Sequence, residues 1–142
     1  MTQVDFYILK DGSKRDRFEL ACLVTEKALN AGHRVVIHTP SSDVAQKMDS
    51  MLWTYSDQSF IPHELLDNTD SSLNAVLIGN AQSAHEEHDV LINLAADVPT
   101  FFSRFQRLAE CVDIDEVARQ SSRERYRFYR DRGYPLNTHE IA

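Results

Sequence analysis

The sequence is poor in cysteine and contains no long apolar run. Its 142 residues include two cysteines, Cys22 and Cys111, which are widely spaced and lie in apolar patterns. A disulfide or a metal role is therefore disfavoured, and both residues are predicted to be reduced thiols in the core. No apolar stretch approaches the length that crosses a bilayer, and the first residues lack the basic and apolar regions of a signal peptide. These absences predict a cytoplasmic protein.

Glycine is scarce at the place where α/β proteins usually bind nucleotides. The first expected turn from strand to helix, residues 9–15, contains only Gly12, which is too few for a dinucleotide fingerprint, and the spacing of a P-loop is absent. The fragment Gly12-Ser13-Lys14 has the residue types to hold an anion at a helix start, but a solvated turn is the favoured interpretation.

Patterns for catalysis or metal binding are also missing. His85 and His88 are three residues apart in a polar stretch, whereas the zinc-protease pattern needs histidines four apart on a helix, so an exposed loop is expected. Neither cysteine has a visible base partner, and no nucleophile elbow occurs. The sequence predicts no catalytic residue, no metal site and no cofactor. A nucleotide-binding α/β enzyme that uses the carboxyl edge of the sheet is kept as an alternative function.

The apolar patterns predict an α/β fold in one domain over residues 1–142. Short apolar segments alternate with segments of helical spacing, which indicates a largely parallel sheet flanked by helices. This arrangement is Rossmann-like without a glycine-rich nucleotide loop. The predicted strands are 4–9, 34–38, 75–79, 89–94 and 109–113. The predicted helices are 14–31, about 42–53 and 115–132, with helical spacing also at Phe101, Phe102, Phe105 and Leu108.

Charge is distributed unevenly along the chain. Residues 1–118 hold nine Lys/Arg and nineteen Asp/Glu, a net of −10, whereas residues 119–142 hold six arginines and three acids, a net of +3. The overall net charge of −7 argues against non-specific coating of DNA, because affinity for phosphates depends on a cationic surface. A local basic patch instead suits a smaller acidic target.

Four of the six C-terminal arginines are concentrated on one side of the predicted last helix. At about 100° per residue, Arg119, Arg123, Tyr126 and Arg130 fall in a narrow stripe, and Arg127 flanks it. We call these five residues the arginine stripe. Guanidinium groups around a tyrosine form a surface suited to carboxylates and an aromatic side chain.

The other side of the same helix carries its apolar residues. Ile114, Val117 and Phe128 fall opposite the stripe and are expected to pack on the sheet. Arg125 and Arg132 lie outside the stripe and are not expected to take part in binding.

Three interpretations of the arginine stripe stay open at this point. Ordinary salt bridges on a solvated face are the default for such a helix, but only Glu124 and Asp131 are nearby in the sequence to neutralise six cations. Binding is therefore favoured, either of an acidic peptide or of single-stranded nucleic acid stacked on Tyr126. The acidic remainder of the chain favours the peptide.

Several segments resemble a known family. RERYRFYR at 123–130 followed by GYPLNT at 133–138, together with VDFYIL at 4–9, LWTY at 52–55 and SFIPH at 59–63, is similar to the chi subunit of bacterial DNA polymerase III holoenzyme. The resemblance spans nearly the whole chain. It implies a non-catalytic adaptor of the clamp-loader complex, which meets DNA only indirectly and no membrane. The implied partners are the psi subunit and the acidic C-terminal tail of single-stranded-DNA-binding protein, which ends in phenylalanine.

The resemblance also implies two sets of site residues. The tail site would be lined by Arg123, Tyr126, Arg127, Arg130 and Thr138, with Arg119 at its rim. The psi site would contain Trp53, Phe60 and Pro62. From spacing alone, Trp53 could equally end its helix in the core.

Overall fold

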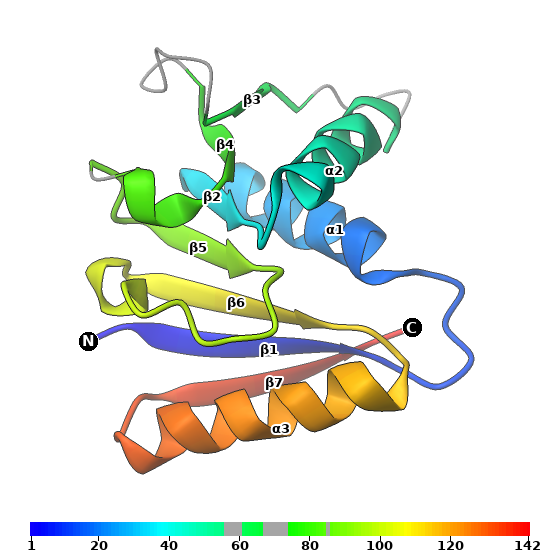
Figure 1. Cartoon of the computed structure of the whole chain (residues 1–142), viewed down its shortest axis with the longest axis vertical. Helices are drawn as coiled ribbons and strands as arrows, with labels where there is room; N and C mark the ends of the chain where they lie inside the picture. The colour runs from blue at the N-terminus through cyan, green and yellow to red at the C-terminus, as the bar shows by residue number, and fades with distance from the viewer. Residues whose placement is uncertain (56–60, 67–73, 85) are drawn as a thin grey trace.

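Seven short strands and three helices make up the chain in this computed structural model, which describes residues 1–55, 61–66, 74–84 and 86–142 (Figure 1). The strands are β1 Gln3–Leu9, β2 Val35–His38, β3 His63–Leu65, β4 Val76–Gly79, β5 Val90–Asn93, β6 Arg107–Val112 and β7 Leu136–Ile141. The helices are α1 Arg17–Asn30, α2 Ser42–Thr54 and α3 Glu116–Asp131, with short 3-10 turns η2 Ala81–Ser83 and η3 Phe102–Arg104.

The strands form one sheet in the order β3-β4-β2-β5-β6-β1-β7, and every neighbouring pair is parallel. Helices α1 and α2 cover one face, while α3 and the two 3-10 turns cover the other (Figure 1). The α/β prediction is therefore confirmed. Strands β3 and β7 form the two edges, so α2 with β3 and α3 with β7 lie at opposite ends of the sheet.

Each helix begins at a side-chain cap. The carboxylates of Asp16 and Asp115 accept from the backbone N–H three residues on, at Glu19 (2.9 Å) and Ala118 (3.0 Å), and the Ser41 hydroxyl does the same for Val44 (3.3 Å). These caps satisfy amide groups that a helix start leaves unpaired. In the first turn of α1 and of α3, one backbone amide therefore already donates a hydrogen bond to a carboxylate of the chain itself.

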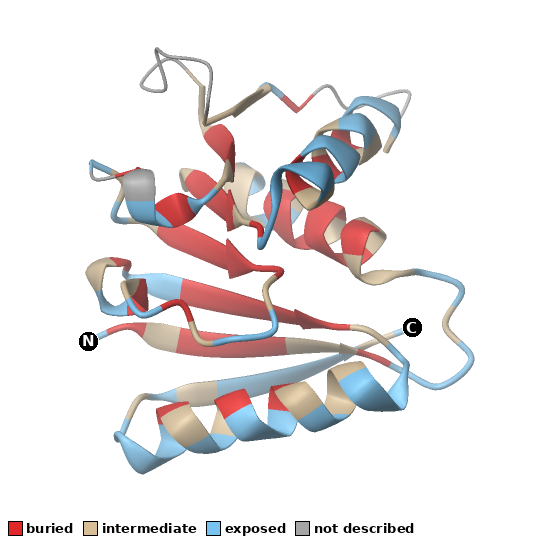
Figure 2. Cartoon of the chain, viewed as in Figure 1, coloured by how far each residue is buried: buried red, intermediate tan, exposed pale blue. Residues whose placement is uncertain are grey.

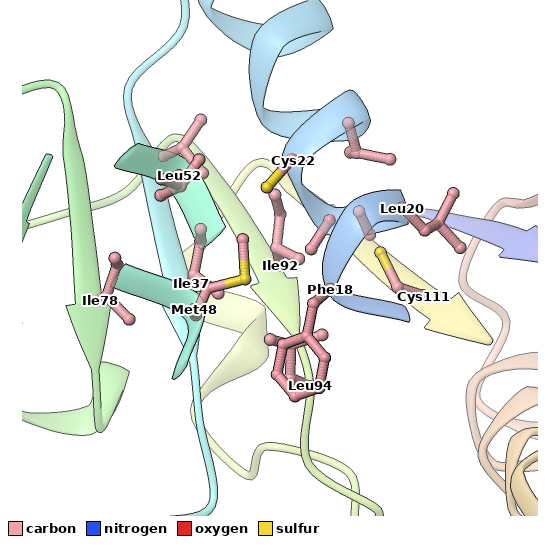
Figure 3. Packing of buried hydrophobic residues seen from close by; sticks show 14 of the residues in the cluster. Phe18, Leu20, Cys22, Ile37, Met48, Leu52, Ile78, Ile92, Leu94 and Cys111 are labelled. Carbon is pink, nitrogen blue, oxygen red and sulfur yellow. The ribbon is translucent and has the colours of Figure 1, made fainter. Parts of the chain in front are cut away.

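The interior consists of two apolar clusters, one on each face of the sheet (Figure 2). The cluster beneath α1 and α2 contains Phe18, Met48 and Ile92 together with both cysteines (Figure 3). Cys22 and Cys111 are free and buried, and burial raises the pKa of the Cys22 thiol to about 12 and that of Cys111 further. Both therefore stay protonated, and the prediction of reduced core thiols is confirmed.

The predicted helical segment at 101–108 is wrong. Only η3 Phe102–Arg104 forms a single turn there, and β6 begins at Arg107. Phe102, Phe105 and Leu108 are all buried in the second cluster, which explains their spacing, but a turn and a strand place them there instead of one helix face.

Two edge strands were not predicted. β3 has three residues, and β7 is largely polar and exposed along its length. The chain turns into β7 at Gly133, where φ is 79°, a conformation that favours glycine and ends α3. In the part of the chain that the structure describes, none of the helices has both the length and the apolar character to cross a membrane.

Candidate functional site

Helix α3 buries a different side from the one that its apolar residues indicate. Ser122, Arg125 and Tyr129 face the sheet, whereas Ile114 is 39% exposed and Val117 is 80% exposed. The prediction that Ile114 and Val117 pack on the sheet is wrong. Phe128 is half-buried, with its ring 6.2 Å from that of Phe102.

A buried carboxylate explains why this side of α3 faces the sheet. Glu110 on β6 is completely buried, and its Oε1 accepts from Arg125 Nε at 3.0 Å while its Oε2 accepts from the Tyr129 hydroxyl at 2.7 Å. The amide of Asn93 donates to both oxygens, at 3.1 and 3.2 Å. Because all three partners donate, the geometry fits the ionised carboxylate. We call these four residues the Glu110 network.

The electrostatics of the Glu110 network follow from its burial. Burial raises the pKa of Glu110, while the Arg125 charge and the hydrogen bonds from Tyr129 and Asn93 act in the opposite direction. Burial and the adjacent Glu110 carboxylate raise the pKa of the Tyr129 phenol, so it stays a donor. The network fixes the rotation of α3 on the sheet, because an unpaired charge in the core is costly.

Sequence reasoning missed the Glu110 network, although a signal was present. Glu110 interrupts the apolar run Leu108-Ala109-Glu110-Cys111-Val112, and a charged residue within a buried strand requires a buried partner. Arg125 is that partner, which agrees with its predicted absence from the binding surface. It also donates through Nη1 to the backbone oxygen of Ala96 at 2.8 Å, so it ties α3 to the loop after β5.

With that side buried, the arginine stripe begins beside the end of β1. Arg119 Nη2 is 2.8 Å from Asp11 Oδ1 and donates to the backbone oxygen of Leu9 at 3.2 Å. Arg119 is thereby held at the carboxyl end of β1.

The other stripe arginines are more exposed. Arg123 Nη1 lies 3.1 Å from Glu116 Oε1, and Arg130 Nη2 lies 3.2 Å from Asp131 Oδ1. Arg127 is exposed and takes part in no ion pair within the described ranges.

The expectation about neutralising acids needs correction. Asp131 does pair with a stripe arginine, Arg130. The other two carboxylates that pair with the stripe are Asp11 and Glu116, and no ion pair of Glu124 occurs among the described residues. Asp11 is distant in the sequence and is brought to Arg119 by the fold. The three paired carboxylates are 64–89% exposed, so each pair stabilises the protein by only about 0–1 kcal/mol and an incoming carboxylate can replace it.

Tyr126 and Thr138 are brought together through Phe6. The Tyr126 ring is half-buried and contacts the Phe6 ring edge-on, with centroids 5.3 Å apart. Thr138 on β7 is in register with Phe6 on β1, so its side chain lies on the same face of the sheet, toward α3. The segment after Gly133 therefore folds back beside the helix, as expected.

A hollow of about 530 Å³ lies between the first half of α3 and the ends of β1 and β7. Its apolar lining comes from Ile8, because the Leu9 side chain is buried in the cluster on the other face of the sheet, and its rim is formed by charged and polar groups. The complete lining is Ile8, Leu9, Lys10, Asp11, Arg119, Ser122, Arg123 and Glu140. Of the predicted tail-site residues, Arg119 and Arg123 line this hollow; the remaining members of the stripe continue along α3 beyond it.

Of the predicted psi-site residues, Trp53 and Pro62 lie at the opposite edge of the sheet. Trp53, in the last turn of α2, is 58% exposed, and its ring centroid is 4.7 Å from that of His63 on β3. The alternative in which Trp53 belongs to the core is therefore wrong. Pro62 is exposed next to buried Ile61, and Phe60 lies outside the described residues.

Metal binding finds no support where the structure describes the chain, since no group of three or more His, Cys, Asp or Glu side chains is arranged to hold an ion there. His85 lies outside the described residues. The helix starts at the carboxyl edge of the sheet are occupied by Asp16 and Asp115, which disfavours a phosphate at either one.

Comparison with known proteins gives one consistent result. The family described as "DNA polymerase III chi subunit, HolC" matches residues 1–137. Curated proteins named "DNA polymerase III subunit chi" are similar over almost their full lengths. The protein from Pseudomonas aeruginosa is 36% identical over 99% of this chain and 98% of its own, and that from Escherichia coli is 29% identical over 97% of each. The protein from Haemophilus influenzae is 28% identical over 96% of each.

Proposed function

The chain belongs to the DNA polymerase III chi subunit family and is thus a component of the replication machinery, and from this premise we propose that it is a non-catalytic adaptor between two proteins. It binds the acidic C-terminal tail of single-stranded-DNA-binding protein at the arginine stripe of α3. It binds the psi subunit of the clamp loader at the α2–β3 edge. This role places the protein in the bacterial cytoplasm, where the chromosome is copied.

The observation that carries the tail site is two weakly paired guanidinium groups, of the exposed Arg123 and the partly exposed Arg119, beside a hollow whose lining includes Ile8. Arg119 and Arg123 border the hollow, and their own carboxylate partners are exposed. A peptide that ends in phenylalanine supplies carboxylates for the guanidinium groups and a ring that can pack against the Ile8 side chain. Binding exchanges exposed pairs for better desolvated ones, which favours the complex.

The nucleic-acid alternative has less support. Stacking of a base needs a free aromatic face, but the Tyr126 ring is half-buried against Phe6. A duplex or a long single strand would also meet the carboxylates Asp11 and Glu140 at the rim of the hollow.

The tail proposal predicts a specific loss in an arginine variant. Arg123→Ala should weaken binding of a synthetic peptide with an acidic segment and a terminal phenylalanine by about tenfold, or about 1.4 kcal/mol, because it removes a charge-assisted hydrogen bond. Affinity is measured by isothermal titration calorimetry at low and at physiological salt, and it should fall as salt rises.

Arg132→Ala is the matched control. It removes the same charge from the same helix, but the Arg132 guanidinium lies 3.5 Å from the centroid of the Phe128 ring, away from the stripe. Its affinity should stay within about twofold of the unmodified protein. Equal losses of affinity in the two variants would mean that only the net charge of the protein matters. If neither variant loses affinity, the proposed tail site is wrong.

The proposal that psi binds at the α2–β3 edge rests on the exposed side chains of Trp53 and Pro62 there. A large aromatic side chain left 58% exposed is a typical anchor of a protein interface. Trp53→Ala should therefore weaken psi binding by roughly 30-fold or more, which corresponds to about 2 kcal/mol. Co-purification and titration with psi provide the measurement.

Val117→Ala serves as the comparison for Trp53, since Val117 is also an exposed apolar residue but lies on α3 at the other end of the sheet. It should leave psi binding unchanged. If Trp53→Ala retains full affinity while the protein stays folded, psi does not use this edge.

A further inference from the structure

A second hollow adjoins the one beside the arginine stripe. It measures about 540 Å³ and is lined by the loop between β1 and α1 together with Glu19 and Ala142. Lys10 and Asp11 line both hollows, so the two share a border. In Figure 1 this loop, the end of β7 and the first turn of α3 lie near one another at the right of the view.

The second hollow is bordered by two cations, Lys10 and Lys14, that have no acidic partner among the described residues. Both are exposed, and neither takes part in an ion pair there. Arg15 Nη1 donates to the Ala142 oxygen at 2.7 Å, which ties the loop to the end of β7. Unpaired cations are notable here because residues 1–118 carry a net charge of −10, from nine Lys/Arg and nineteen Asp/Glu.

A single carboxylate lies at the junction of the two hollows. Asp11 is 89% exposed and pairs with Arg119 at 2.8 Å. It occupies the position where a bound acidic chain would cross from α3 to the loop. An incoming carboxylate can displace it, because an exposed pair of this kind is weak.

From this shared border and charge we infer that the surface for the acidic tail extends past α3 onto the β1–α1 loop, where Lys10 and Lys14 bind the acidic residues that precede the terminal phenylalanine. The inference rests on the proposed function. An extended peptide advances about 3.3 Å per residue, so a few residues beyond the chain end are enough to leave the α3 hollow. The loop provides a second group of cations for the peptide. Between this loop and α3, Asp11 competes with the carboxylates of the peptide for Arg119.

The test compares two peptides against loop variants. The long peptide carries several acidic residues before the terminal phenylalanine, and the short one keeps the chain end but has its distal acids replaced by serine. Lys10→Ala/Lys14→Ala should weaken the long peptide by about fivefold and leave the short one within about twofold, because each exposed pair contributes about 0.2–1 kcal/mol. Asp11→Asn should strengthen both by about two- to fivefold, since it frees Arg119 and removes a repelling charge.

Lys27→Ala on α1 is the control for net charge, because Lys27 is exposed in the last turn of that helix, at the end away from the loop, with its Nζ 5.8 Å from the centroid of the Tyr7 ring. It should weaken both peptides equally and by less than about twofold. If Arg123→Ala weakens the long peptide but the double lysine variant does not, the extension onto the loop is wrong while the tail site stands. If no variant changes either peptide, the tail site itself is wrong.

Discussion

Replacing Arg125 by alanine is expected to lower the free energy of unfolding at neutral pH by about 3–5 kcal/mol, because it leaves the completely buried Glu110 carboxylate without its cation. The Arg125 Nε to Glu110 Oε1 distance is 3.0 Å, and the same guanidinium also donates to the Ala96 backbone oxygen. Both bonds are lost in the variant. Urea denaturation followed by circular dichroism measures the change.

The size of this loss should depend on pH in a defined direction. Burial already raises the pKa of Glu110 above its ordinary 4.5 in the folded protein, and the Arg125 charge is the largest influence that lowers it. A carboxyl group whose folded pKa is raised contributes stability that is present below the unfolded pKa and is lost as pH rises through the folded pKa. Without Arg125 the folded pKa rises further. The difference between the unmodified protein and Arg125→Ala should therefore be smallest near pH 4.5 and grow toward neutral pH.

Two further variants separate charge from packing. Arg127→Ala, on the exposed side of the same helix, should change the free energy of unfolding by no more than about 0.5 kcal/mol. Glu110→Gln/Arg125→Met should lose less stability than Arg125→Ala, since it removes the buried charge together with its partner and keeps an acceptor for the Tyr129 hydroxyl. A double variant as unstable as Arg125→Ala, with no dependence on pH in either, would mean that the charge of Glu110 does not determine how α3 packs.

Phe102→Ala should produce a loss of similar size, about 3–5 kcal/mol, through a cavity under the second half of α3. The Phe102 side chain is 4% exposed, and its ring centroid lies 5.1 Å from that of Tyr129 and 4.9 Å from that of Tyr134. These rings join η3 to the end of α3 and to the turn before β7. Amide hydrogen exchange in α3 and β7 should therefore accelerate more than exchange in β2 and β5.

The adjacent Phe101 provides the comparison. It is half-buried, with its ring 5.2 Å from that of His38, and Phe101→Ala should cost roughly half as much. A loss below about 1 kcal/mol for Phe102→Ala, or exchange that accelerates equally throughout the sheet, would contradict a specific role of Phe102 in docking α3.

Local sequence patterns were sufficient for most of the fold. Continuous apolar segments such as 34–38 and 75–79 became central parallel strands, because a strand covered on both faces must be apolar throughout. The ends of α2 and α3 were predicted within a few residues, since caps and glycines act on their immediate neighbours. The alternation of strands and helices then led directly to the α/β class.

The candidate site was only partly predictable. The arginine stripe follows from the helical period alone, and Arg119 and Arg123 do line one hollow beside the ends of β1 and β7. Its partners do not follow from the period. Asp11 reaches Arg119 only because β1 ends beside α3, and Thr138 comes into register with Phe6, which Tyr126 contacts, only because β7 pairs with β1. A polar segment such as 136–141 has no apolar pattern that would indicate a strand.

The composition and periodicity of this chain were thus enough to specify its class, its core thiols and a cationic helix face, because those properties depend on neighbours a few residues apart. The side of α3 that faces the sheet, the acids that neutralise the arginines and the separation of the two candidate surfaces came from contacts between distant segments. The buried Glu110 on β6 requires Arg125, and that single long-range pair turns α3 so that Val117 faces solvent while Arg119 reaches the end of β1.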